Sequence, residues 1–221
     1  MRITLPVPHY STLSRRARRL ELSLATPKKI RHLVIDSTGL KVYGEGEWKV
    51  RTHGKDKRRT WRKLHIAMDA ESHQLTSVVL TDNEQLDRWA VPHLLKQTEA
   101  SIKYVCGDGA YDFEQCYRAI KEKEATALIP PGSDAIVRGK SPFESRDENV
   151  RAIKKLSRKQ WKRKSGYHKR SLVETAFYRL KTIFSDKLKS RRAETQKIEA
   201  ELRCLALNRM TALGMPQSYA V

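Results

Sequence analysis

The sequence has little cysteine, no long apolar run and few acidic residues, and each shortage excludes a class of protein. No stretch is long and apolar enough to span a membrane, and no apolar core of a signal peptide follows the basic N-terminus. The cysteines form no CxxC pair and, with the seven histidines, no zinc-ligand pattern. We therefore expect free thiols in a reducing compartment, and a cytoplasmic, nucleoid-associated protein. The cysteines are Cys106, Cys116 and Cys204.

The shortage of acids leaves 25 acidic residues against 45 lysines and arginines, a formal charge of +20. Residues 151–192 hold 16 basic residues and two acids. Residues 48–65 and residues 1–31 each hold eight basic residues and one acid. A solvated basic face would explain any one of these clusters. Three clusters, two of them carrying tryptophan, favour a polyanion such as nucleic acid. A membrane surface is less favoured, because no stretch pairs the charge with a strong apolar face.

The 221 residues, 39% of them hydrophobic, allow one sizeable core. Apolar runs and alternation predict strands over residues 31–43, 61–69, 74–80, 101–108 and 125–129. Helical patterns cover residues 11–22, 87–100, 113–124, 146–159, 171–184 and 194–213. A basic loop is expected at residues 48–60. An antiparallel meander followed by alternating strands and helices predicts a mixed sheet covered by helices.

The stretch YHKRSLVETAFYRLK, residues 167–181, is the centre of the functional prediction. On a helix, Tyr167, Arg170, Glu174 and Lys181 fall within roughly 60° of one another. A carboxylate flanked by cations on a helix edge suits a metal ion bound beside a phosphate backbone. The adjoining apolar face comprises Val173, Ala176, Phe177, Leu180, Ile183 and Phe184.

The same stretch also fits a capping box, in which Ser171 starts the helix and Glu174 reaches back to it. Glu174 would then have a structural role, and Tyr167 and Arg170 would lie in the preceding loop. The stretch taken alone leaves both interpretations open.

Two aspartates give the first interpretation more weight. Asp36 follows a continuous apolar run, and Asp108 lies in a Gly-Asp-Gly turn after another. If those strands are neighbours, both aspartates meet at one sheet edge, and the late helix can bring Glu174 to them. Three converging carboxylates repel one another unless a cation lies between them. Oxygen ligands fit Mg²⁺ or Mn²⁺, and two such ions about 3.5–4 Å apart can support an in-line phosphoryl displacement.

Both aspartates also have simpler explanations. Asp36 fits an Asp-Ser-Thr turn or cap, and Asp108 fits an Asp-Gly turn. Asp112 competes with Asp108 for the middle position. Its place before the helix at residues 113–124, with Gln115 three residues later, predicts an N-cap. We prefer Asp108 for that reason, and the sequence leaves the alternatives open.

The Asp36-Ser-Thr-Gly strand, the GDGAYD turn and the Y-x2-R-x3-E-x6-K signature together resemble DDE transposases of bacterial insertion sequences, in particular the insertion-sequence-five family. The resemblance implies an α/β, RNase H-like mixed sheet, with an antiparallel three-strand meander plus two parallel strands, flanked by helices. This domain would span residues 31–193, with a basic insertion at 131–166 and a C-terminal helix at 194–221. The implied metal-binding and catalytic residues are Asp36, Asp108 and Glu174. The implied DNA contacts are Tyr167, Arg170 and Lys181.

Such enzymes use two Mg²⁺ or Mn²⁺ ions, hydrolyse the phosphodiester bond at transposon ends and join the freed 3′-hydroxyl to target DNA. They act as synaptic multimers, often homodimers. Members usually carry a longer N-terminal region that recognises the terminal repeats. We therefore expect residues 1–30 to be a remnant of that region or a basic arm, with the core kept and end recognition lost. Two alternatives stay open: a truncated, non-catalytic DNA-binding inhibitor, and another RNase H-like nuclease.

Overall fold

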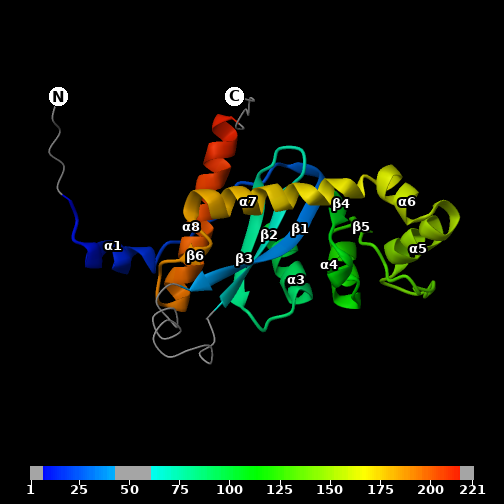
Figure 1. The fold of residues 1–221 in the computed structure, drawn as a ribbon, viewed down its shortest axis with the longest axis horizontal. Helices are drawn as coiled ribbons and strands as arrows, with labels where there is room; N and C mark the ends of the chain where they lie inside the picture. Colours follow the sequence, from blue (N-terminus) through cyan, green and yellow to red (C-terminus); the bar gives the residue numbers. More distant parts are fainter. Residues whose placement is uncertain (1–6, 43–60, 215–221) are drawn as a thin grey trace.

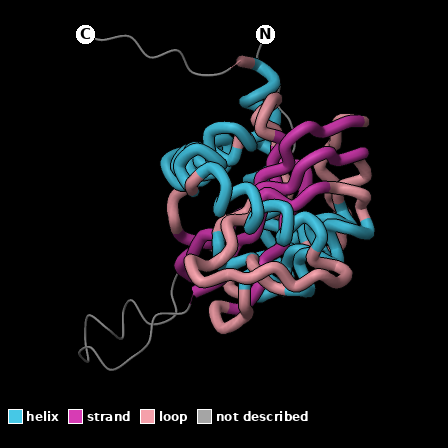
Figure 2. Tube along the Cα trace, turned by 90° about the vertical axis from the view of Figure 1, so that its right-hand side faces the viewer, coloured by secondary structure: helices cyan, strands magenta, loops and turns pink. Residues whose placement is uncertain are grey.

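The computed structural model describes residues 7–42 and 61–214, which form one mixed sheet with helices on both of its faces (Figures 1 and 2). The strands are β1 (Lys29–Val42), β2 (Trp61–Asp69), β3 (Leu75–Asp82), β4 (Ser101–Cys106), β5 (Thr126–Leu128) and β6 (Lys187–Leu188). The helices are α1 (Tyr10–Ala17), α3 (Asp87–Gln97), α4 (Glu114–Glu122), α5 (Glu144–Leu156), α6 (Arg158–Ser165), α7 (Leu172–Phe184) and α8 (Ala193–Leu213). Within those two ranges, no helix has the length and apolarity needed to cross a membrane.

The strand order is β3-β2-β1-β4-β5, and β6 pairs with the end of β1. The β1–β2 and β2–β3 pairs are antiparallel, whereas β1–β4 and β4–β5 are parallel. This confirms the predicted meander plus two parallel strands and agrees with an RNase H-like α/β fold. The sequence did not predict β6, because two residues are too short to show an alternating pattern. The basic loop expected at residues 48–60, with Trp48, lies outside the described residues.

Strand β1 is buried on both faces, which explains its continuous apolar run. Leu33 and Ile35 belong to a core shared with α3 and α4. Val34, between them, belongs to a second core shared with α7 and α8. All three are fully buried. Burying each such side chain contributes roughly 1.5–3 kcal/mol, so β1 anchors the layers above and below it.

Helix α3 corrects one local prediction. The helix was expected to begin near Pro92, yet it begins at Asp87 and contains Pro92. A proline inside a helix has no N–H to donate to the carbonyl four residues earlier, here that of Arg88. That carbonyl instead lies 3.9 Å from the thiol of Cys116 on α4, which donates to it. Tertiary packing thus supplies a partner for the carbonyl.

The basic segment at residues 131–166 contains more structure than expected. A single helix capped by Ser145 was predicted at residues 146–159. The structure has α5, which begins after Phe143, and then the unpredicted α6. The buried Asn149 side chain donates to the Ala127 carbonyl on β5 at 2.8 Å and accepts from the Trp161 indole at 3.2 Å. The segment is therefore fastened to the edge of the sheet.

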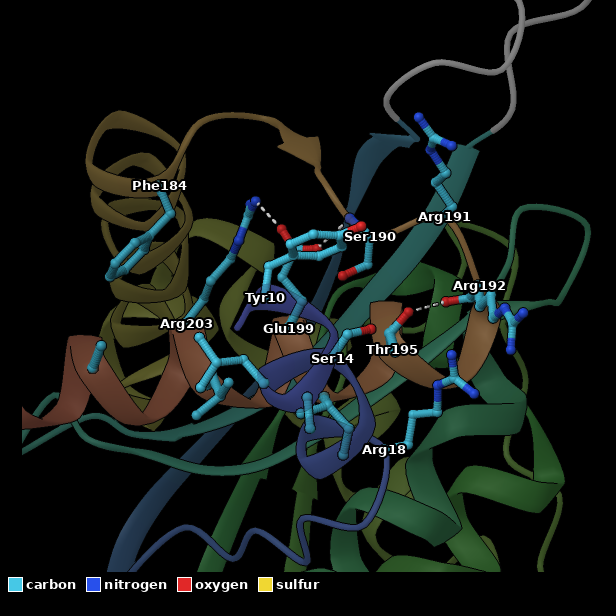
Figure 3. Close-up of a pocket in the computed structure, with 15 residues that line it drawn as sticks. Tyr10, Ser14, Arg18, Phe184, Ser190, Arg191, Arg192, Thr195, Glu199 and Arg203 are labelled. Atoms are coloured by element: carbon cyan, nitrogen blue, oxygen red, sulfur yellow. Dashed lines mark hydrogen bonds and ion pairs between the residues drawn. The ribbon is translucent and has the colours of Figure 1, made fainter. Parts of the chain in front are cut away.

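Helix α1 lies against α8 and lines a groove of about 950 Å³ with it (Figure 3). Tyr10 and Leu13 of α1 line this groove opposite Leu202 of α8. His9, rather than the expected Ser11, caps the helix, and α1 buries none of its residues. None of the three candidate acids lines the groove.

Candidate active site

The two candidate aspartates lie side by side because β1 and β4 are parallel neighbours. The last pair of that ladder is Val34 opposite Cys106. Asp108 follows Cys106 by two residues, just past the end of β4, and its charge acts on Asp36. Asp36 follows Val34 by two residues within β1 and therefore shares its face. That face is the one covered by α7, since Val34 and Cys106 both belong to its core. The expectation that the first and fourth strands are neighbours is therefore confirmed.

Asp36 lies inside its strand. The position at the end of the strand that the sequence had suggested for it is wrong. Strand β1 continues to Val42, and Asp36 pairs with Ile66 of β2. What ends near Asp36 is the pairing with β4. The Asp36 carboxylate accepts the Ser37 backbone N–H at 2.8 Å and is 16% exposed. A continuous antiparallel partner thus fixes the backbone beneath this carboxylate.

Arg170 joins the third acid to the first. Its Nη2 donates to Asp36 Oδ2 at 3.2 Å, and its Nη1 donates to Glu174 Oε1 at 2.9 Å. One planar guanidinium therefore holds carboxylates that are 138 positions apart in the sequence. Arg170 Nε is buried and has no hydrogen-bond partner among the described residues. A cation already occupies the space between Asp36 and Glu174.

The charges around Arg170 influence one another. Burial raises the pKa of the Asp36 carboxyl above its usual value, and the negative charges of Asp108 and Glu174 raise it further. The Ser37 N–H and the Arg170 guanidinium oppose this rise without cancelling it. Burial would lower the pKa of Arg170, but the surrounding acids raise it instead. All three acids thus lie within electrostatic reach of one guanidinium.

The helix carrying Glu174 is not started by a capping box. A 3-10 helix, Tyr167–Ser171, runs directly into α7. The Ser171 side chain makes no cap bond, and its hydroxyl donates to the His168 carbonyl at 2.9 Å. Glu174 is 59% exposed and paired with Arg170 four residues earlier. The capping-box interpretation is therefore wrong, and the helix presents Arg170 and Glu174 on one side.

The other two residues of the signature differ in exposure. Tyr167 is only 8% exposed, and its ring packs 5.3 Å from that of Trp161. Burial raises the pKa of Tyr167, and the charges of Asp108 and Asp36 contribute. Lys181 lies about 10 Å further along the helix than Glu174 and has no partner in the described part of the chain. The sequence predicted that the four side chains of the signature line one edge of a helix. Tyr167, the first of them, is buried.

Asp112, the alternative to Asp108, is bound by two other side chains. Its Oδ1 accepts from the Tyr117 hydroxyl and from Arg146 Nε, both at 2.8 Å. The predicted N-cap role is wrong, because α4 begins at Glu114 without a side-chain cap. Asp108 uses Oδ1 to accept the Ala110 N–H at 2.8 Å. The Oδ2 atoms of both aspartates have no hydrogen-bond partner in the described ranges, but only Asp112 is held in an ion pair, with Arg146. Asp108 is therefore the aspartate whose charge is not already matched by an ion pair.

Asp87, at the first turn of α3, is a fourth acid near the site that the sequence analysis missed. Its Oδ1 accepts from the Ser37 hydroxyl at 3.0 Å and lies 3.3 Å from Lys63 Nζ. His65 Nδ1 lies 3.7 Å away, and burial lowers the pKa of His65 to about 4. Burial raises the pKa of Tyr111, and the charges of Asp87 and the two site aspartates add to this. The sequence signal that could have identified Asp87 was an acid in the first turn of a helix. Acids are common at that position, so the signal is weak.

The donor set fits Mg²⁺ or Mn²⁺ in chemistry, although it is not arranged around an ion. Carboxylate oxygens are the ligands these ions prefer. In the described ranges, no three His, Cys, Asp or Glu side chains are grouped as metal ligands. Arg170 takes one oxygen each from Asp36 and Glu174.

Two family models match the sequence. A model described as a transposase DDE domain matches residues 27–209, which include the whole sheet and all three acids. A second model with the same description matches residues 1–45.

The different surroundings of Asp112 and Asp108 predict different effects on stability. Asp112→Ala leaves Arg146, whose side chain is 7% exposed, without its carboxylate. We expect a loss of about 3 kcal/mol in the free energy of unfolding, measured in urea. Asp108→Asn keeps a good capping side chain and should change it by less than about 0.5 kcal/mol. Equal losses in both variants would contradict this division of roles.

The raised pKa of Asp36 predicts a pH-dependent effect of Asp36→Asn. The native chain holds this proton more tightly than the unfolded chain does. The wild type therefore loses stability as the pH rises from 3.8, the ordinary value, through the raised pKa. In EDTA-containing buffer the variant should melt above the wild type at neutral pH, and its advantage should vanish below about pH 4. A variant that melts lower at neutral pH would mean that the Arg170 ion pair outweighs burial.

Proposed function

The chain belongs to the DDE transposase family, and from that premise we propose that it cleaves DNA at insertion-sequence ends and transfers the freed strand to target DNA. Asp36, Asp108 and Glu174 are the proposed metal-binding and catalytic residues. The single observation that carries this proposal is that Asp36 and Glu174 share one guanidinium while Asp108 lies within electrostatic reach of Asp36 and of that guanidinium. The formal charge of +20 suits a DNA substrate. Membership of the insertion-sequence-five family stays a prediction, as does a homodimeric synaptic complex.

The three acids differ in how firmly they are held. Asp36 is fixed by the β1–β2 ladder and its N–H bond, and Asp108 by its bond to Ala110. Glu174 is mostly exposed on a helix and has Arg170 as its partner. We infer a rigid pair of ligands on the sheet and a third that adjusts when the site is loaded. Two bound Mg²⁺ or Mn²⁺ ions would activate a water or a 3′-hydroxyl and neutralise the leaving oxygen.

Arg170 has a double role in this proposal. In the structure it neutralises Asp36 and Glu174. A guanidinium binds phosphate oxygens in the same two-pronged way as it binds carboxylates. When a DNA backbone reaches the site, Arg170 exchanges its carboxylate partners for a phosphate, and its unpartnered Nε gives it a further donor. The freed oxygens of Asp36 and Glu174 would then be available to hold the metal, so DNA binding and metal binding would favour each other.

The non-catalytic alternative has one observation in its favour. Arg170 is ion-paired with Asp36 and Glu174, two of the three acids. A protein that only binds DNA, however, has no use for three acids gathered where they repel phosphate. The positive charge supports both functions equally and does not separate them.

The decisive prediction concerns Glu174→Gln. We expect Mg²⁺-dependent cleavage of a duplex carrying an insertion-sequence end to fall at least about 100-fold, while the affinity for that duplex is kept. Glu122→Gln, an exposed change on α4, is the matched control and should cleave normally. A Glu174→Gln protein that cleaves like the wild type would refute the assignment. Binding without cleavage by the wild type would favour the inhibitor, and faster cleavage of an RNA–DNA hybrid would favour another RNase H-like nuclease.

The exchange at Arg170 predicts opposite effects of Arg170→Gln on two ligands. Without DNA, Mn²⁺ measured by calorimetry should bind about tenfold more tightly, because two ion pairs no longer compete. The affinity for DNA should fall, and the slope of log K against log salt should lose about one unit. Lys154→Gln, on the exposed side of α5, is the control. Unchanged or weaker Mn²⁺ binding by Arg170→Gln would contradict the exchange.

A further inference from the structure

A basic hollow of about 440 Å³ lies beside the acidic site, on the same face of the sheet. Its basic and aromatic lining comes from β1, β4, α6 and the 3-10 helix that precedes α7. These residues are Arg31, His32, Tyr104, Arg163, Lys164 and Lys169. No acid lines it.

The floor of the hollow is a fixed pair of rings. His32 and Tyr104 are opposite each other in the β1–β4 ladder, with ring centroids 5.1 Å apart and planes 25° apart. His32 is 5% exposed, and its Nδ1 lies 3.3 Å from Lys169 Nζ. Burial lowers the pKa of His32, and the charges of Lys169 and Arg31 lower it further. The lowered pKa favours the neutral imidazole, whose Nδ1 accepts a hydrogen bond from the Lys169 ammonium.

The wall above the floor requires glycine. Gly166 has φ +75°, and a Cβ at this position would lie 3.2 Å from His32 Nε2. Both facts disfavour any other residue. The close approach lets the end of α6, which carries Arg163 and Lys164, lie over the strands.

Three of the four cations around the hollow are not balanced by the described part of the protein. In the described ranges, Arg31, Arg163 and Lys164 have no ion-pair or hydrogen-bond partner. Lys169 has His32 and, 3.6 Å away, Glu71. Cations held near one another repel, and an anion between them relieves the repulsion. The hollow therefore has the character of a site for an anion.

The position of the hollow relates it to the acids. His32 and Asp36 are four residues apart on the same face of β1, a separation of about 13 Å. Lys169 is the residue before Arg170. This distance is too long for one phosphate group to reach both places, and short enough for one strand of DNA to do so.

We propose that this hollow binds a backbone phosphate of the same DNA strand whose reacting phosphate lies at the acids. The inference rests on the proposed function and adds to it a second, fixed point of attachment. Guanidinium and ammonium donors match phosphate oxygens. One face of the Tyr104 ring is already covered by His32, so a stacked base is less favoured than the backbone. The site holds the strand in register relative to the acids.

The test compares two paired substitutions that remove equal charge. Arg163→Ala with Lys164→Ala empties the rim of the hollow, whereas Lys154→Ala with Lys155→Ala removes two exposed cations from α5 outside it. All four side chains are exposed, so both proteins should fold. Binding of a fluorescent duplex is measured across a salt series by anisotropy. The slope of log K against log salt should lose about one unit in the first protein and stay unchanged in the second.

A second measurement locates the phosphate. Duplexes carrying one neutral methylphosphonate at successive positions should weaken wild-type binding at one position away from the cleaved bond, and the Arg163/Lys164 protein should not respond there. Equal slopes in all three proteins, or a wild type that responds at no such position, would overturn the phosphate site while leaving the proposed function standing. Calorimetric binding of inorganic phosphate with no methylphosphonate response would mark a free-anion site and would also overturn it. A wild type that neither binds nor cleaves duplex DNA would overturn the proposed function and this inference together.

Discussion

The structure depends on how three carboxylates on one face of a sheet are neutralised. Asp36 and Asp108 come together because two parallel strands are neighbours, and α7 adds Glu174. Arg170 supplies the positive charge by pairing with Asp36 and Glu174 at once. The pKa of Asp36 is nevertheless raised by its burial, so one guanidinium does not fully offset the cost.

The basic segment before α7 determines where Arg170 lies. Asn149 ties α5 to β5, Trp161 packs on Tyr167, and the 3-10 helix continues into α7 without a break. Arg170 is held four residues before Glu174, where a helical pair of this kind forms readily. The same segment carries Arg163 and Lys164 to the rim of the second hollow. One structural unit therefore positions both the cation at the acids and the cations beside them.

The sequence predicted the sheet well because period-2 patterns and apolar runs are local. The β2 prediction matches its observed bounds. The pairing of β1 with β4 was only a condition of the sequence argument, because β2, β3 and α3 lie between these strands in the chain. The errors lie where tertiary contacts decide. Asp112 is taken by Arg146 rather than by a helix N-terminus, and Pro92 is tolerated inside α3 because Cys116 reaches the carbonyl that it leaves. The bridge from Arg170 to Asp36 spans 134 positions, and no local pattern predicts such a contact.

The central claim is that the guanidinium of Arg170 stands where a divalent cation binds in the DNA-bound protein. Anomalous diffraction from crystals grown with Mn²⁺ and an insertion-sequence end tests it most directly. The account predicts manganese peaks about 2.1 Å from oxygens of Asp36, Asp108 and Glu174, with Arg170 turned onto a phosphate. Arg170 still bridging Asp36 and Glu174 beside bound DNA, with no manganese at these acids, would contradict it.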